Sequence, residues 1–170
     1  RFKVDLTGLD LRLEDAYFPV ATSIMDIDWT PATGQFALRE AALQIGQSSA
    51  RLSGVFAMGL DPTYGPTLGI SLNARDVVVH PDDMVAPAEP FDSIGFTGWS
   101  APLYGAVGID RLVVRKGEAA VEAAGRLDML QAGMGVDLTL AGQGLSADDM
   151  KRLWPYMMAP EGRDWFINHV

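Results

Sequence analysis

The sequence predicts a mostly β fold: an antiparallel meander of strands, followed by two short helices at the C-terminal end. Most of the chain alternates apolar and polar residues with a period of two, which is typical of strands that bury one face. Short turns rich in glycine, proline and aspartate separate these segments, and no helical segments lie between them. Sequential strands are therefore expected to pair antiparallel. Helix start signals occur only after residue 145.

The chain contains an internal repeat, residues 29–60 and 99–131, and repetition at a fixed period is typical of repeat architectures. The copies align when one residue is inserted before the first glycine. A spacing of 71 residues then matches Gly34 with Gly105, Gly46 with Gly117 and Gly54 with Gly125. The apolar positions match as well: Phe36 with Val107, Leu38 with Ile109, Leu43 with Val114, Ala50 with Val121, Phe56 with Leu127, and Met58 with Met129.

The alternation predicts the strands in order. They are expected at residues 2–13 with a phase shift at Gly8, and at 23–29, 35–45, 49–60, 67–74, 77–79, 92–100, 106–114, 119–128 and 136–140. Turns are expected at residues 46–48, 61–66 and 133–135, where glycine, proline and aspartate gather. The proline-rich stretch 81–90 has no periodicity and predicts a loop with one helical turn, which separates the two copies of the repeat.

The C-terminal stretch 146–170 is expected to be a helical linker. Ser146 is placed as an N-cap with Asp149 three residues later, and Leu145 with Met150 forms a hydrophobic staple. Leu153 and Trp154 continue the apolar face of Met150, and Pro155 ends this helix. Pro160 in a first turn beside Glu161 opens a second helix, which carries Trp165 and Phe166.

Length and charge exclude several classes of protein. The chain has 170 residues, of which 48% are hydrophobic, enough for a single domain with a substantial core. It has 13 basic and 22 acidic residues and a net charge of −9, which argues against nucleic acid as a partner. It has no cysteine, and no apolar run approaches the roughly 20 residues of a membrane-spanning helix. Because it begins at Arg1 without a methionine, we expect a segment of a longer protein.

No enzyme motif stands out, and we expect no catalytic residue, metal or cofactor. No nucleophile elbow, phosphate loop or Gly-x-Gly-x-x-Gly is present. His80 with Asp82 and Asp83 lacks a spacing that converges on an ion, so a solvated acidic loop is favoured. Asp26 and Asp28 are expected on the exterior of a strand.

At its C-terminal end the chain resembles a known family. The segment LSADDMKRLWPYMMAPEGRDWFINHV is similar to the linker of the large AsmA-like, YhdP-type proteins of Gram-negative bacteria, and the glycine-punctuated strands before it are similar to that family's β-units. The positions that carry the resemblance are Leu153, Trp154 and Pro155, then Ala159 and Pro160, then Arg163, Asp164 and Trp165.

The resemblance implies a periplasmic, inner-membrane-anchored protein whose strands curl into an open, taco-like trough. Its anchor would lie outside this segment, and adjacent repeats of the same chain would continue the trough. Such proteins carry phospholipid between the inner and outer membranes, a role in outer-membrane biogenesis. The expected partners are phospholipid acyl chains.

The residues themselves leave two readings of the apolar strand face open. Most in-phase apolar stripes are core, so these side chains could fill a closed sandwich or barrel in a structural or protein-interaction module of the envelope. An apolar face that stays open is instead typical of a binding surface, as the resemblance implies. The candidate lining residues are Phe36, Leu38, Leu52, Phe56, Met58, Leu60, Leu68, Ile70, Leu72, Val107, Ile109, Val121, Leu127, Val136, Leu138 and Leu140.

Overall fold

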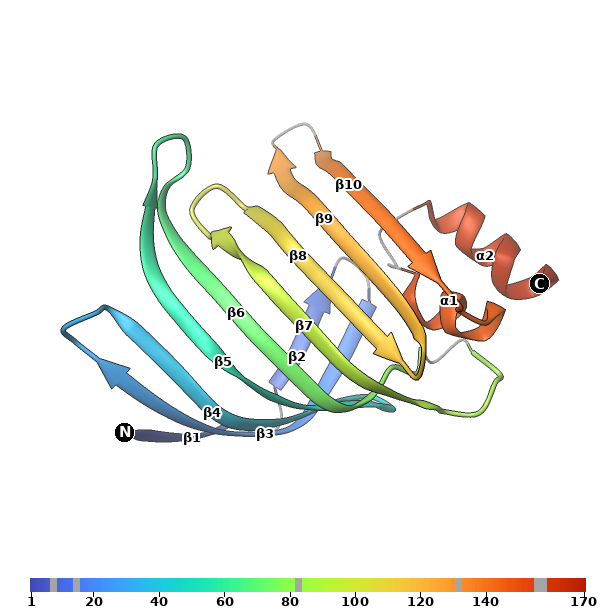
Figure 1. The fold of residues 1–170 in the computed structure, drawn as a ribbon, viewed down its shortest axis with the longest axis horizontal. Helices are drawn as coiled ribbons and strands as arrows, with labels where there is room; N and C mark the ends of the chain where they lie inside the picture. Colours follow the sequence, from blue (N-terminus) through green and yellow to red (C-terminus); the bar gives the residue numbers. More distant parts are fainter. Residues whose placement is uncertain (7–8, 14–15, 82–83, 131–132, 155–158) are drawn as a thin grey trace.

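The described residues form one curved, open antiparallel sheet of ten strands with two helices after the last strand (Figure 1). The computed structural model describes residues 1–6, 9–13, 16–81, 84–130, 133–154 and 159–170. The strands are β1 (Phe2–Leu6), β2 (Leu9–Leu13), β3 (Ala16–Thr30), β4 (Gln35–Ile45), β5 (Ser48–Asp61), β6 (Gly65–Val78), β7 (Pro90–Ala101), β8 (Ala106–Lys116), β9 (Ala119–Leu130) and β10 (Gly133–Gln143), and the helices are α1 (Ala147–Leu153) and α2 (Pro160–His169).

The sheet is a meander that does not close on itself. Each strand from β3 to β9 pairs antiparallel with the next one along the chain, and β1 and β2 both pair with β3. In the part of the chain that the structure describes, β10 pairs only with β9. Figure 1 shows the strands bending along their length, so that the sheet curls into a trough. The predicted fold class is confirmed, and a closed barrel is excluded.

The same pairing irregularities recur at an interval of 71 residues. The β3–β4 register shifts between Asp26 and Ile27, and the β7–β8 register shifts between Thr97 and Gly98. A bulge follows Leu38 in β4 and Ile109 in β8. The two copies are already 71 residues apart before the first glycine, because Pro31 and Pro102 begin turns of equal length. The residue that the sequence alignment inserts before this glycine is therefore wrong.

Two pairs of repeated glycines have clear physical reasons. Gly46 and Gly117 both adopt a φ of 56° in the turns that follow β4 and β8, a left-handed conformation that glycine takes without a Cβ clash. At Gly54 a Cβ would lie 2.1 Å from the Ser71 carbonyl oxygen, and at Gly125 it would lie 2.0 Å from the Asp137 carbonyl oxygen. The neighbouring strand therefore approaches too closely for any side chain at these two positions.

Two local predictions are wrong. Residues 77–79 are not a separate strand, because β6 continues through Asp76, whose φ of 51° shifts the pairing with β5 and the phase of the apolar residues. The turn predicted at residues 133–135 is the start of β10, where Gly133 pairs with Leu130. The predicted helical turn in the 81–90 stretch stays a prediction: Met84 N–H donates to the Pro81 carbonyl oxygen over 3.1 Å, but residues 82 and 83 lie outside the described residues. Strand β7 begins at Pro90.

The helix signals are confirmed. Asp149 N–H donates to Ser146 Oγ over 3.1 Å and Ser146 N–H donates to the Asp149 carboxylate over 3.4 Å, which forms the predicted capping box. Helix α1 ends at Leu153, and Pro155 lies outside the described residues. Helix α2 begins at Pro160, as predicted.

The best-buried core lies at one end of the strands. Ala74, Val77, Phe91 and Val114 form a buried cluster, and Leu153 of α1 packs against it. Met84, in the connection before β7, is 7% exposed. Helix α1 therefore covers this end of the trough, and among the described elements no other helix packs on the curved face.

Candidate functional site: an apolar trough

Direct cross-strand pairing places apolar residues in continuous rows along one face of the sheet, which we call the trough face. Directly opposite residues of paired strands lie on the same face. One row crosses β3 to β10 through Trp29, Phe36, Phe56, Ile70, Gly98, Ile109, Gly125 and Leu138. The next row on one side runs through Ile27, Leu38, Gly54, Leu72, Phe96, Leu112, Ala123 and Leu140.

A third row runs through Met25, Ala41, Leu52, Ala74, Ile94, Val114, Val121 and Gly142. A shorter row lies on the other side of the first one and runs through Met58, Leu68, Ser100, Val107, Leu127 and Val136. No member of the four rows is charged. The bulges after Leu38 and Ile109 keep the apolar residues on the trough face. Each bulge adds one residue to its strand, so that the next apolar residue, three positions later, lies on the same face as the one before it.

Exposure increases across the trough face. Ala41 is 1% exposed and Leu38 is 7% exposed, whereas Met58 is 61% and Leu60 is 80% exposed near the opposite rim. Val136 and Leu140 on the last strand are 43% and 52% exposed. In the part of the chain that the structure describes, these apolar side chains thus stay exposed, and a continuous exposed apolar surface is typical of a binding surface.

The trough face continues under helix α1 as a groove. This groove has a volume of about 480 Å³, within the roughly 300–1,000 Å³ that small-molecule sites occupy. Strands β8 to β10 form one wall, and the start of the linker with α1 forms the other. Its lining residues are Ile109, Leu112, Val114, Val121, Ala123, Leu127, Val136, Leu138, Leu140, Ala141, Gly142, Leu145, Met150, Leu153 and Trp154.

A buried ionic cluster, which we call the helix latch, fastens α1 to the sheet. Asp149 and Arg152 are 4% and 3% exposed although both carry charge. The Asp149 carboxylate accepts from Lys116 Nζ of β8 over 2.7 Å and from Arg152 Nη1 over 3.4 Å. Lys116 also pairs with Glu89, and Arg152 donates to the Pro87 carbonyl oxygen. The latch thus joins α1, β8 and the connection before β7.

The latch perturbs the acidity of its members. Burial acts to raise the pKa of Asp149, but the hydrogen bonds from Lys116 and Ser146 outweigh it and hold that pKa below its ordinary value. The Asp149 and Glu89 carboxylates raise the pKa of Lys116 above its ordinary value. The charged forms of both groups are therefore favoured where α1 meets the sheet.

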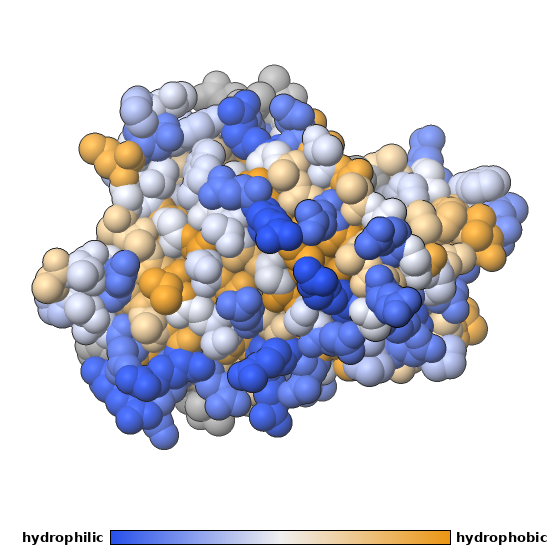
Figure 2. All heavy atoms as spheres, in the orientation of Figure 1, coloured by the Kyte–Doolittle hydropathy of each residue, from blue (hydrophilic) through white to orange (hydrophobic). Residues whose placement is uncertain are grey.

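The opposite face of the sheet is polar and carries ion pairs. Asp26 pairs with Arg1 and Asp28 pairs with Arg39, so both aspartates face outward as expected. The Arg1 hydrogen bond lowers the pKa of Asp26. Figure 2 shows hydrophilic side chains interspersed with hydrophobic ones on the face turned toward the viewer.

The pairing register brings the candidate lining residues together on the trough face. They all belong to the four rows except Leu60, which stands beyond Met58 at the rim. Several members of the rows were missed, among them Phe96, Leu112 and Val114. Strict alternation from Ile109 would place Leu112 and Val114 on the opposite face. This break in the alternation is the signal in the sequence that could have indicated a bulge.

Two aromatic residues of the linker behave differently from each other. Trp154 lines the groove and packs on Phe166 with ring centroids 5.7 Å apart, which joins α1 to α2. Trp165 is 59% exposed and stacks on His169 at 5.4 Å. Trp165 therefore contacts its own helix and is not buried against the sheet.

The expected absence of metal and enzyme chemistry stays a prediction. The His80 backbone N–H donates a hydrogen bond to Ser48 Oγ over 3.0 Å. Asp82 and Asp83 lie outside the described residues. Among the residues that the structure describes, no group of three or more potential ligands could hold a metal ion. Within the same residues, neither helix is long and apolar enough to cross a membrane. No family model, curated protein or solved structure matches the chain.

Proposed function

We propose that this chain is a segment of an apolar conduit that shields lipid acyl chains from water. The observation that supports the proposal is the set of three uncharged rows that run from β3 to β10 on an open trough face. Burying a methylene group stabilises by about 0.8 kcal/mol. An acyl chain that moves along such rows leaves one set of apolar contacts for an equivalent set, so it meets no large free-energy barrier.

The length of the trough suits this role. Neighbouring strands lie about 4.8 Å apart, so the seven steps from β3 to β10 span about 34 Å. An acyl chain of a bilayer spans one leaflet, about 15 Å or half of the hydrocarbon core. The rows would therefore hold a whole chain in contact while leaving free surface ahead of it, as transport requires.

The polar opposite face suits an arrangement with headgroups outside the trough. The resemblance of residues 145–170 to the AsmA-like linker supports a periplasmic location, an inner-membrane anchor outside this segment, adjacent repeats that extend the trough, and phospholipid as cargo. On this proposal the protein is not an enzyme, and its conduction between the inner and outer membranes is passive.

The test is site-specific photo-crosslinking in cells that express the intact protein. A photoreactive residue would replace Phe56 or Leu127 on the trough face. The matched control is Arg51 on the polar face, whose side chain is 63% exposed. Mass spectrometry would identify attached lipid. We expect phospholipid at Phe56 and Leu127 and none at Arg51.

The alternative is a structural or protein-interaction module whose trough face is covered by another polypeptide. Crosslinks to protein at Phe56 and Leu127, with no lipid at any position in a folded protein, would refute the conduit and support this alternative. Lipid at Arg51 as often as at Phe56 would indicate nonspecific membrane contact, and it would also contradict the proposal.

A further inference from the structure

The polar face of the sheet carries a line of arginines, which is unexpected in a chain of net charge −9. The pairing register sets Arg51 opposite Arg75, Arg75 opposite Ser93, and Ser93 opposite Arg115. Like charges directly opposite each other on paired strands destabilise a sheet. Arg51 is compensated by Glu40 at 3.6 Å and Asp76 at 3.4 Å. Within the described part of the chain, no carboxylate lies within ion-pair distance of Arg75 or Arg115.

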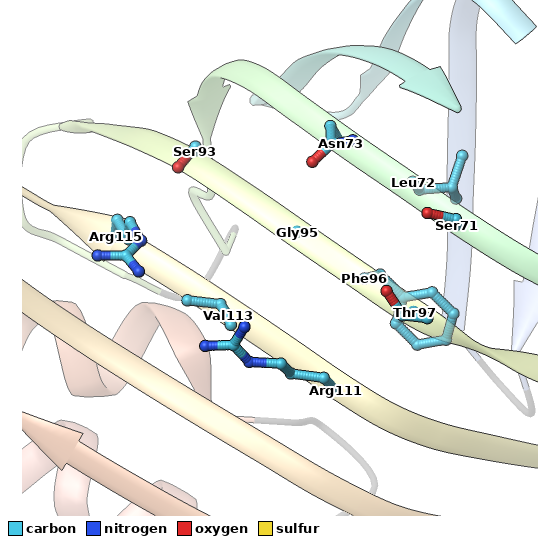
Figure 3. A pocket seen from close by; sticks show the side chains of 10 residues that line it. All are labelled: Ser71, Leu72, Asn73, Ser93, Gly95, Phe96, Thr97, Arg111, Val113 and Arg115. Atoms are coloured by element: carbon cyan, nitrogen blue, oxygen red, sulfur yellow. The ribbon is translucent and has the colours of Figure 1, made fainter. Parts of the chain in front are cut away.

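A depression adjoins this line over β6, β7 and β8, and we call it the arginine hollow. Its volume is about 280 Å³. Figure 3 shows Arg111 and Arg115 on β8 and the polar side chains of Ser93, Asn73 and Thr97 on the neighbouring strands around Gly95. The lining residues are Ser71, Leu72, Asn73, Ser93, Gly95, Phe96, Thr97, Arg111, Val113 and Arg115.

Gly95 leaves the centre of the hollow open. It pairs with Asn73 on one side and with Val113 on the other. A Cβ at this position would meet no atom closer than Asn73 Oδ1 at 3.8 Å, which is ordinary contact. Close packing therefore does not require glycine here, unlike at Gly54 and Gly125, and a larger side chain would fill the hollow.

The donors around the hollow suit an anion with several acceptor oxygens. Arg115 offers a guanidinium without an acidic partner among the described residues, and Arg111 offers the donors that its 2.8 Å pair with Glu122 leaves free. Hydroxyl groups of Ser93 and Thr97 and the Asn73 amide add donors. Guanidinium groups match the geometry of phosphate oxygens in paired hydrogen bonds.

We propose that the arginine hollow binds a phosphate group. Arg115 and Arg111 approach the phosphate from β8, and the hydroxyl groups complete its coordination. The phosphate belongs either to a small soluble molecule or to a lipid headgroup. Apart from Leu72 and Phe96, which also belong to the trough rows, the residues that line the site lie on the face opposite the trough. The proposal does not depend on the proposed conduit.

The test compares the unchanged protein with variants at low ionic strength, because salt screens such exposed charges. Inorganic phosphate would be titrated while backbone amide NMR signals of β6 to β8 are followed. Phosphatidylcholine vesicles with and without phosphatidylglycerol would be used in co-sedimentation. The variants are Arg115→Gln, which removes donors, and Gly95→Val, which fills the hollow without a change of charge. The control is Arg126→Gln, which makes the same charge change at an exposed arginine that pairs with Asp128 at 2.7 Å outside the hollow.

We expect saturable phosphate binding that Arg115→Gln weakens about tenfold or more, since a charge-assisted hydrogen bond is worth at least about 1.4 kcal/mol. Gly95→Val should abolish it, and Arg126→Gln should leave it unchanged. This pattern with phosphate alone identifies a soluble ligand, and the same pattern only with phosphatidylglycerol vesicles identifies a headgroup. Binding of neither probe, or equal weakening by Arg126→Gln, would overturn the proposal. Circular dichroism checks the fold, and Arg115→Gln decides alone if Gly95→Val fails to fold.

Discussion

The substitution Asp149→Asn tests whether the helix latch holds α1 on the sheet. Asparagine is nearly isosteric, but it leaves the Arg152 guanidinium, 3% exposed, without its anionic partner. Removing one member of a buried ion pair costs about 3–5 kcal/mol. Lys116 would keep Glu89 and Arg152 would keep the Pro87 carbonyl oxygen, so we expect a loss near the lower end, about 3 kcal/mol.

Urea unfolding would measure the loss in global stability, and amide hydrogen exchange in α1 would show whether the helix detaches first. The matched control is Asp148→Asn on the same helix. The Asp148 side chain is 51% exposed and lies 3.9 Å from Lys151, so we expect a change below about 0.5 kcal/mol. Equal effects of the two substitutions on stability and on exchange in α1 would refute the latch.

The latch also predicts a pH dependence. Because the pKa of Asp149 is lower in the folded protein than in the unfolded chain, the unfolded chain binds more protons between the two values, and stability rises with pH there. The contribution is complete above the unfolded value of about 3.9 and is lost as the pH falls through the folded value. We therefore expect Asp149→Asn to flatten the loss of stability below about pH 4. An unchanged acid profile in the variant would contradict this assignment.

Two further predictions concern the strands. Gly54→Ala and Gly125→Ala should each destabilise by about 1–3 kcal/mol, because the new Cβ would overlap a backbone carbonyl of the next strand. Gly69→Ala, whose Cβ would lie 3.5 Å from its nearest neighbour, should be neutral or stabilising in thermal unfolding, and equal losses at all three positions would contradict the argument. Leu112→Asp should weaken binding of a fluorescent fatty acid at least tenfold, since it places a charge in the groove, whereas Val113→Asp on the polar face should not. Equal weakening by both aspartates would show that the face assignment is wrong.

Local signals predicted most of the strands and both helices. Alternation within each strand set its inner and outer face, and the capping residues Ser146 and Asp149 set the start of α1. The failures occurred where local phase is ambiguous. At Asp76 a left-handed residue inside β6 looked like a strand boundary. At Gly133 a glycine that looked like a turn residue is paired in β10.

The sequence by itself determined the class of the fold and the face on which most apolar side chains lie, because period-two alternation and turn chemistry act between near neighbours. Only the tertiary structure decided that the sheet stays open, that α1 closes one side of a groove, and that Lys116, Asp149 and Arg152 meet. Openness depends on whether β10 finds a partner strand, and the latch joins groups 33 residues apart in the chain. The arginine line across Arg51, Arg75 and Arg115 likewise arises only from the register of four strands. Such contacts between distant residues leave no periodic trace in the sequence.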